Sequence, residues 1–565
     1  MATKPSASIT SITFSSGQKI KLKKNEKIVL VGPNNSGKSQ SLREIVILSN
    51  NGNHTPSIVI SKIEILKTGT SRDLKAFLDE KATRITNGYL YGHWALGENI
   101  IRHWDTEGLR HGLHLGFMKN IAANERLKIC EQQPSIGPGE QKSKPQHVLY
   151  DDSNLMDKVS GLFRQAFGSD LMFDFRGGQK LPIHVGGTPH ENLVDRVSDS
   201  YVKEVRKNPL LDQQGDGIKS YAGILFESVV ADLDITLIDE PEAFLHPPQM
   251  RRLGETLASE VHGQLVVATH SSDIMRGFLE GTKGNVRILR LRREGDKNFV
   301  AEASPGAVRE LWETPVLRYS NALEGIFHEQ TIICEDDSDC RLINSIADHL
   351  AAKSDDQWID TAYVPTGGKH GIPKVASVLR KIGVPVKAVF DLDFLSEQSL
   401  LETTVQAFGG EWAEIKPIWA RLDAAVRKGI RSKTVDEIKN DIKSIIDDSE
   451  KDALPKGDIN EAMKQSGPWH QVKSYGSIAI PKGDAQKDYA NLRDMLEKIG
   501  IFLVPVGEME NFCPELGKHG PKFVTKLLTE VPLDDDRLSE LRIFAENVHK
   551  GPHSPLDQHV DDKDR

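Results

Sequence analysis

The sequence predicts an α/β protein with two parallel-sheet domains in series, and three observations lead to this prediction. A glycine-rich loop, Gly32 to Ser39, separates an apolar run at residues 28–31 from a helical pattern at residues 39–49. Two further apolar runs, residues 234–238 and 264–268, end in polar side chains. In the second half of the chain, strand-like apolar runs alternate with helical patterns. Such alternation is typical of a parallel sheet covered by helices.

The glycine-rich loop fits the phosphate-binding pattern. Its sequence is Gly32-Pro33-Asn34-Asn35-Ser36-Gly37-Lys38-Ser39. The glycines let the backbone close around phosphate oxygens, and the amides of the helix N-terminus supply partial positive charge. Lys38 adds a full positive charge, and Ser39 can ligate a magnesium ion. We therefore expect ATP with Mg²⁺ to bind at Gly32, Asn34, Asn35, Ser36, Gly37, Lys38 and Ser39.

The next two apolar runs supply residues that can act on a bound nucleotide. The first delivers Asp239 and Glu240 to a strand end, where open α/β sheets bind their ligands. Asp239 is expected to hold the magnesium ion through water, and Glu240 to orient and deprotonate the attacking water. The second run ends in Thr269-His270-Ser271, where His270 can donate a hydrogen bond to the γ-phosphate.

These motifs resemble those of ABC-type ATPases, in the branch that includes DNA-repair proteins and OLD (overcoming lysogenization defect) proteins. The most specific part is the segment LIDEPEAFLHP at residues 237–247. The resemblance implies a head-to-tail dimer, in which a signature motif of one subunit closes the nucleotide site of the other. The usual Ser-Gly-Gly-Gln pattern is missing, and residues 213–220 look like a divergent equivalent. Gly217 and Ser220 are its candidate nucleotide contacts, and a plain helix-entry loop is the alternative.

A second group of acids follows later strands. Glu335 comes directly after the apolar run at residues 330–334, and Asp391 and Asp393 follow the run at residues 386–390. The βαβαβ alternation predicts that these acids meet at the carboxyl edge of one sheet. Asp391 and Asp393 point the same way from an extended segment, so they can share a hard cation such as Mg²⁺ or Mn²⁺. Such a site can polarise a phosphodiester, with Glu335 as ligand or general base; an acidic sheet cap is the alternative.

The second group resembles a Toprim domain, the metal-dependent fold of topoisomerases, primases and OLD nucleases. The resemblance implies metal ligands at Glu335, Asp339, Asp391 and Asp393. Asp336 stands where a glycine is common. Which of the early acids bind metal therefore stays open.

The resemblance to OLD nucleases extends to two later features. Residues 500–510 look like the late OLD element that supplies acids for a second metal, with Glu510 favoured over Glu508. OLD nucleases also use a lysine near the scissile phosphate, where a cation offsets charge in the transition state. Lys473 and Lys369 are the best placed lysines in chain order, and Lys473 is the candidate catalytic one; a solvated or backbone-binding lysine is the alternative for either.

The composition agrees with a large protein of several packed domains. The chain has 565 residues, of which 38% are hydrophobic, and its net charge is −9. This charge argues against a uniformly basic DNA coat but allows a local basic groove. No apolar stretch has membrane-spanning length, and the start lacks the pattern of a signal peptide, so we expect a cytoplasmic protein. The four cysteines show neither zinc nor disulfide spacing.

The predicted organisation is an ABC-type ATPase domain at residues 1–325 and a Toprim domain at residues 326–550. A helical insertion that mediates dimerisation is expected at about residues 50–212, and a second helical insertion at about 395–467. The tail at residues 551–565 is expected to be disordered.

The order of the two motif sets implies an OLD-type, nucleotide-gated, metal-dependent DNA endonuclease that also hydrolyses ATP. The resemblance further implies a role in antiviral defence, assembly as a homodimer or larger oligomer, and accessory partners such as a retron reverse transcriptase with its msDNA. The alternative is a non-catalytic DNA-binding ATPase of the repair type with a structural Toprim domain. A topoisomerase is disfavoured because the chain after Glu510 is too short for a strand-passage domain.

Overall fold

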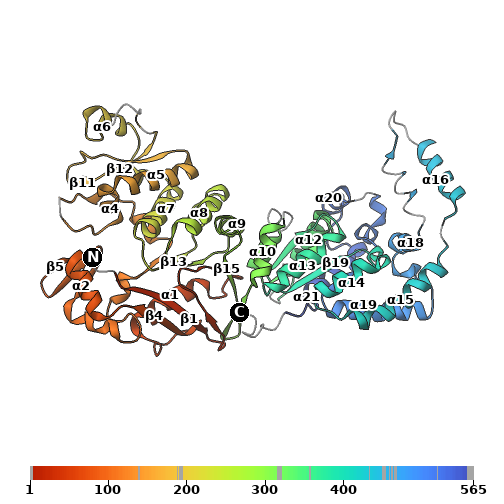
Figure 1. Ribbon diagram of the computed structural model, residues 1–565. Helices are drawn as coiled ribbons and strands as arrows, with labels where there is room; N and C mark the ends of the chain where they lie inside the picture. The colour runs from red at the N-terminus through yellow and green to blue at the C-terminus, as the bar shows by residue number, and fades with distance from the viewer. Residues whose placement is uncertain are drawn as a thin grey trace. The chain divides into compact units, whose positions relative to one another are not determined.

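The computed structural model divides the chain into two compact units, Met1–Thr314 and Pro315–Arg565. It describes residues 4–556 apart from 138–139, 188, 190–194, 315–320, 356–357, 432, 448–453, 457–458, 460–461, 464–466 and 518–519. Most of the predicted disordered tail, residues 557–565, therefore lies outside the described residues. The units are described one at a time below, and Figure 1 labels their elements.

A six-stranded sheet forms the centre of the first unit (Figure 1). Its order is β16-β15-β3-β14-β13-β8, and all neighbours are parallel except the antiparallel pair of β15 and β16. The bounds are β3 (Lys27–Val31), β8 (Met118–Ile121), β13 (Ile235–Asp239), β14 (Gln264–Ala268), β15 (Arg287–Glu294) and β16 (Lys297–Glu302). Every residue of β14 is buried, as expected for a strand covered on both faces.

Helix α1 lies between the central sheet and a second, antiparallel sheet of order β2-β1-β4 (Figure 1). Leu42, Ile45 and Leu48 of the helix pack into one core with residues of both sheets. The elements of this layer are α1 (Lys38–Asn51), β1 (Ser6–Phe14), β2 (Lys19–Lys21) and β4 (Ile60–Thr68). The remaining large helices of the core are α7 (Asp216–Leu225), α8 (Pro247–Glu260), α9 (Ser272–Gly281) and α10 (Pro305–Glu313).

The prediction that residues 50–212 form a helical insertion is wrong, because this stretch contains strands as well as helices. This stretch contributes β4 and β8 to the two sheets above and also forms three small antiparallel sheets. Its other strands are β5 (Thr83–Ile85), β6 (Gly88–Tyr91), β7 (Trp94–Gly97), β9 (Gln133–Pro134), β10 (Asp170–Phe173), β11 (Lys180–Leu181) and β12 (Ile183–Gly186). Its helices are α2 (Ser71–Lys81), α3 (Glu125–Lys128), α4 (Pro145–Asp151), α5 (Ser153–Phe167) and α6 (Asp199–Val205). Strands of two to four residues are too short to show an alternating pattern.

The second unit has a parallel sheet of order β18-β17-β19-β20. The strands are β17 (Gln330–Cys334), β18 (Thr361–Pro365), β19 (Val386–Phe390) and β20 (Ile501–Leu503). Helices α12, α20 and α21 share a core with one face of this sheet, and α13 contacts β17 and β19. Their bounds are α12 (Asp337–Ala351), α13 (Ile372–Lys381), α20 (Pro521–Glu530) and α21 (Ser539–Lys550). The predicted α/β fold class is confirmed.

The stretch predicted as a second insertion is helical in its described parts. It contains α14 (Gln398–Ala407), α15 (Trp412–Gly429) and α16 (Val435–Asp447), and α18 (Pro468–Tyr475) and α19 (Asp484–Lys498) follow it. Among the described residues, no helix is both long enough and apolar enough to cross a membrane.

We expect Gln264→Ala to lower the free energy of unfolding of the first unit by about 1–3 kcal/mol. Gln264 is fully buried; its Oε1 accepts from the Ile9 amide at 2.9 Å and its Nε2 donates to the Ile9 carbonyl at 2.9 Å. Removing the side chain leaves both groups of Ile9 without partners where β1 meets the central sheet. Urea unfolding monitored by circular dichroism measures the loss. The exposed Gln179→Ala is the control, and equal effects of both changes would contradict the prediction.

Candidate nucleotide and metal sites

The phosphate loop joins β3 to α1 and has the backbone that phosphate binding requires. Gly32 (φ 135°) and Gly37 (φ 96°) adopt conformations that favour glycine, and a Cβ on Gly32 would lie 2.2 Å from the Leu291 carbonyl oxygen. Asn34 and Asn35 are exposed, whereas Ser36 is buried and its carbonyl accepts a 2.7 Å hydrogen bond from Asn298 Nδ2. Asn298 lies on β16, far away in sequence, and sequence reasoning missed it.

Lys38 is buried in the loop and is held by backbone carbonyls. Its Nζ donates to Gly32 O at 2.7 Å and to Pro33 O at 2.9 Å. Burial lowers the pKa of Lys38 to about 8, although Glu242, Glu240 and Asp239 raise it. The side chain is therefore largely protonated at pH 7 and is charged where a phosphate would lie.

Asp239 ends β13 and faces the start of α1. Its carboxylate accepts a hydrogen bond from the Ser39 side chain, while burial raises its pKa above the ordinary value. One carboxylate oxygen, Oδ1, is buried without a hydrogen-bond partner. A serine hydroxyl beside a carboxylate with an unsatisfied oxygen is a donor set that suits Mg²⁺. The residues present therefore fit a magnesium ion carried with a nucleotide.

Glu240 follows in a left-handed conformation, with φ 47°. A non-glycine residue keeps this conformation only where its surroundings fix it. The Glu240 amide donates to Ala268 O at 2.9 Å, and Arg126 Nη2 donates to Glu240 O at 2.8 Å. The guanidinium of Arg126 also reaches the carbonyls of Asp239 and Ala243. Arg126, on the short helix α3, positions this backbone, and sequence reasoning missed it because it belongs to no motif.

Glu242 orients the histidine loop and was also missed. Its carboxylate accepts from Thr269 Oγ1 at 2.9 Å and from the His270 amide at 2.8 Å. The His270 ring nitrogen Nε2 lies 3.6 Å from Glu242 Oε1, and its side chain stays 43% exposed. The structure thus brings His270, Asp239, Glu240 and the phosphate loop to one edge of the sheet.

The predicted nucleotide-contact role of Ser220 needs correction, whereas that of Gly217 stays a prediction. Gly217 lies in the first turn of α7, and Ser220 lies further along the same helix. Ser220 is fully buried and its hydroxyl donates to Ala243 O at 3.1 Å. A Cβ on Gly217 would lie 2.6 Å from the Phe244 carbonyl oxygen. Both residues therefore pack α7 against the segment after Glu240, and Ser220 is not accessible to a second subunit.

The second unit brings three of the predicted acids into one cluster. Glu335 follows β17, and Asp391 and Asp393 follow β19; each offers an oxygen within 4.8 Å of the other two. Adjacent parallel strands produce this convergence, because their carboxyl ends meet at one edge. Glu335 Oε1 and Asp393 Oδ1 are buried without hydrogen-bond partners. Converging carboxylates with unsatisfied oxygens fit a hard divalent cation such as Mg²⁺ or Mn²⁺.

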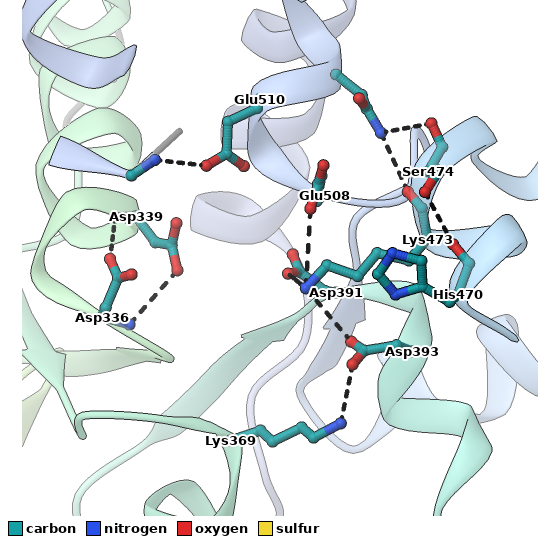
Figure 2. Close-up of polar contacts among 12 residues, drawn as sticks. Asp336, Asp339, Lys369, Asp391, Asp393, His470, Lys473, Ser474, Glu508 and Glu510 are labelled. Carbon is teal, nitrogen blue, oxygen red and sulfur yellow. Dashed lines mark hydrogen bonds and ion pairs between the residues drawn. The ribbon is translucent and has the colours of Figure 1, made fainter. Parts of the chain in front are cut away.

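Lys473, on α18, lies beside Asp391 and Asp393 of this acidic triad, as Figure 2 shows. Its Nζ is 2.8 Å from Asp391 Oδ2 and 3.8 Å from both Asp393 Oδ1 and Glu508 Oε2. Burial would lower the pKa of Lys473, but the charges of Asp391 and Asp393 outweigh it and raise the pKa above the ordinary value. Lys473 therefore stays charged beside the triad, and Glu508 lies on the same side of the triad as Lys473.

The other predicted acids form a second group beside the triad. Asp336 caps α12 by accepting from the amides of Ser338 and Asp339, and Asp339 completes the capping box. Burial and the charges of Asp336 and Asp391 raise the pKa of Asp339 to about 8. Glu510 Oε1 accepts from the Gly520 amide at 2.7 Å. Figure 2 shows Asp339 and Glu510 on the side of Asp391 away from Asp393.

Two carboxyl groups of the triad have raised pKa values. Burial, followed by the charges of Asp391 and Asp393, raises the pKa of Glu335. Burial likewise raises the pKa of Asp391, although Lys473 lowers it. A bound cation would relieve this repulsion, because it stabilises the ionised form of every carboxylate that it contacts.

Comparison with protein families supports both domains. A family model described as "AAA domain, putative AbiEii toxin, Type IV TA system" matches residues 138–276. A second, described as "Overcoming lysogenization defect protein-like, TOPRIM domain", matches residues 326–393. The first match includes Asp239 and His270, and the second ends at Asp393. The chain thus joins an ATPase domain to an OLD-like Toprim domain, as the sequence predicted.

Individual relatives are more distant. The chain is 23% identical over 179 residues to the Old nuclease of Escherichia phage P2, a match that covers 30% of this chain and 29% of the phage protein. The Smc head domain from Pyrococcus furiosus, solved with the C-terminal domain of ScpA, aligns over 55% of this chain and 99% of its own, at 12% identity and a TM-score of 0.33. The SMC head domain from Thermotoga maritima aligns over 54% and 100%, at 12% identity and a TM-score of 0.29. The fold assignment rests on the sheets and the family models rather than on these two structures.

We expect Glu335→Gln to abolish the stabilisation of the protein by Mn²⁺. Because Glu335 is ionised against two neighbouring acids at pH 8, the same change should raise the metal-free stability by about 1–2 kcal/mol there. The pKa of Glu335 is raised, so wild-type Glu335 becomes protonated as the pH falls below that pKa. The stability gained by Glu335→Gln then becomes smaller. Thermal unfolding with and without Mn²⁺ measures both effects. Asp348→Asn on the exposed face of α12 is the control, and an unchanged Mn²⁺ response in Glu335→Gln would rule out the assignment.

Proposed function

We propose that this protein is a cytoplasmic, ATP-hydrolysing DNA endonuclease that uses divalent metal ions at its Toprim domain. One observation carries the proposal: Glu335, Asp391 and Asp393 converge within 4.8 Å of one another with Lys473 beside them. Three carboxylates and a lysine at the end of a parallel sheet suit a phosphodiester, which needs both metal coordination and a compensating positive charge.

In the proposed reaction, water is added across a phosphodiester P–O bond, which leaves a 5′-phosphate on one end and a 3′-hydroxyl on the other. Divalent metal, when bound, polarises the phosphoryl oxygen and makes the bound water more acidic. Asp391 and Asp393 hold the cation, and Glu335 either ligates it or accepts the proton of the attacking water. Lys473 places its charge beside the phosphate, where negative charge grows as the bond breaks.

The ATPase domain is proposed to regulate this cleavage. Lys38 and the loop amides bind the phosphates, Ser39 and Asp239 hold the magnesium, and Glu240 orients the attacking water. Arg126 and Glu242 support this assignment, because they fix the backbone of Glu240 and the position of His270. In this proposal, nucleotide binding closes a homodimer through the ATPase domains and thereby switches the Toprim sites. Gly217 stays a candidate contact to the nucleotide of a second subunit, whereas buried Ser220 does not.

A role in antiviral defence completes the proposal, and it rests on the likeness to OLD proteins. Cells that express the protein should then resist phage, and cells that express Asp391→Ala/Asp393→Ala should not. Plating of a phage panel on both strains measures this. Accessory partners, including a retron reverse transcriptase with its msDNA, stay a prediction.

The test of the nuclease is incubation of the purified protein with supercoiled plasmid and Mg²⁺ or Mn²⁺, with and without ATP. We expect nicking or linearisation that falls about 100-fold or more in Asp391→Ala/Asp393→Ala, because the cation loses its ligands. Asp348→Ala should cut like the wild type, and Lys38→Ala should lose the response to ATP. Wild-type protein that binds DNA but never cuts it would instead indicate a DNA-binding ATPase with a structural Toprim domain.

We expect Glu240→Gln to lower ATP turnover by about 100-fold to 1,000-fold while nucleotide still binds, because the amide cannot take a proton from water. Phosphate release measures turnover, and a fluorescent ATP analogue measures binding. Glu125→Gln, an exposed acid in the same unit, is the control. Normal turnover in Glu240→Gln would overturn the assignment of Glu240.

A further inference from the structure

A second lysine, Lys369, reaches the acidic triad from the side opposite Lys473. Figure 2 shows the two ammonium groups approaching Asp393 from different directions. Lys369 lies on the loop between β18 and α13, which is anchored at the end of β17. The Gly368 amide donates to Glu335 O at 2.7 Å, and the Thr366 hydroxyl donates to Cys334 O at 3.1 Å. The loop is therefore fixed to the same strand end that carries Glu335.

The Lys369 ammonium bridges two carboxylates. Its Nζ is 3.0 Å from Asp393 Oδ2 and 2.8 Å from Glu397 Oε1. Burial would lower the pKa of Lys369, but the hydrogen bond to Glu397 and the charge of Asp393 raise it. Glu397 lies just after the helical turn Leu392–Ser396 and is 37% exposed, whereas the Lys369 side chain is 16% exposed. Glu397 thus holds the lysine at the rim of the triad independently of Asp393.

The contact with Asp393 leaves that residue able to serve as a metal ligand. Asp393 Oδ2 accepts from Lys369, whereas Oδ1 has no hydrogen-bond partner and stays available to a divalent cation. Glu397 gives the lysine a second anchor outside the triad. An ammonium has three N–H donors, so a lysine paired with Glu397 keeps donors for another acceptor.

The surroundings of Lys369 leave room for that acceptor. A Cβ built on Gly367 or Gly368 would have no heavy atom within 4 Å, and the His370 side chain is 70% exposed. The loop therefore has open space on its outer side. The Lys369 ammonium is anchored by Glu397 and lies beside both this open space and the acidic triad. A charged group in such a place suits the phosphate of a nucleic-acid backbone.

We propose that Lys369 is a phosphate-binding residue for the DNA strand at the Toprim site, held in place by Glu397. This inference rests on the proposed nuclease function and adds a second contact to the backbone beside that of Lys473. Lys369 contacts Asp393 and Glu397, and in the DNA complex its remaining N–H donor would face a backbone phosphate. Its positive charge therefore serves first to balance the triad and then to bind substrate.

The alternative is that Lys369 only holds Asp393 in position. The two roles differ in their effect on metal binding. If Lys369 is not needed to position Asp393, Lys369→Gln should bind Mn²⁺ at least as tightly as the wild type. If Lys369 is needed to position Asp393, the same change should weaken Mn²⁺ binding. Calorimetric titration of the DNA-free protein with Mn²⁺ separates the two roles without any measurement of activity.

The decisive experiment is binding of full-length protein to a fluorescent DNA duplex in Ca²⁺, over a series of salt concentrations. We expect Lys369→Gln to weaken binding by about 5-fold to 10-fold and to reduce the slope of log Kd against log salt by roughly 1, because one phosphate contact is lost. Lys369→Arg should recover most of the affinity, because arginine also binds phosphate. Lys374→Gln, an exposed lysine on α13, is the matched control and should match the wild type.

The outcomes separate this inference from the proposed function. Wild-type affinity and slope in Lys369→Gln, or equal losses in Lys369→Gln and Lys374→Gln, would overturn the phosphate-binding role. Wild-type protein that binds no duplex would overturn it as well. If the wild type never cuts plasmid but its DNA binding depends on Lys369 as expected, the phosphate contact stands and the nuclease proposal fails.

Discussion

Both candidate sites depend on carboxylates that are partly buried at the ends of parallel strands. An ionised carboxylate loses hydration when it is buried, so its pKa rises unless a cation or hydrogen bonds offset the loss. Asp239 in the first unit and Glu335 and Asp391 in the second all show this rise. A divalent cation would favour the ionised form of each carboxylate that it contacts, so these strand ends suit metal chemistry.

Each candidate site has a lysine beside its carboxylates, and the two units differ in the groups that the lysine contacts. In the first unit the lysine is paired with neutral carbonyls, because Lys38 donates to Gly32 and Pro33. In the second unit the lysines are paired with the acids themselves, through Lys473 with Asp391 and Lys369 with Asp393. The first arrangement keeps a positive charge available for an anion. The second keeps the triad partly neutralised until another cation arrives.

The sequence predicted the strands and acids well, because their signals are local. An apolar run followed at once by an acid defines both the strand and the residue at its end, as in β17 with Glu335 and β19 with Asp391. The convergence of these acids then follows from the parallel sheet. The prediction of a helical insertion failed because the signals in that stretch are not local. Strand β8 has four residues, and only its pairing with β13 identifies it as part of the central sheet.

The residues that sequence reasoning missed act through contacts between distant parts of the chain. Arg126 reaches the backbone of Glu240 across 114 positions, and Asn298 reaches Ser36 across 262. Neither belongs to a motif, since a side chain that donates to a carbonyl needs no particular neighbours in sequence.

For Ser220 the error was the opposite one, because a residue that was assigned to a motif has a packing role instead. Its hydroxyl donates to Ala243 O, and Gly217 of the same helix lies close to the Phe244 carbonyl, so α7 packs against the segment that follows Glu240. Arg126 holds the same segment at Glu240 and Ala243. The left-handed conformation of Glu240 is thus fixed from two directions within one unit. Because these contacts lie within one unit, the backbone of Glu240 needs no second subunit to adopt this conformation.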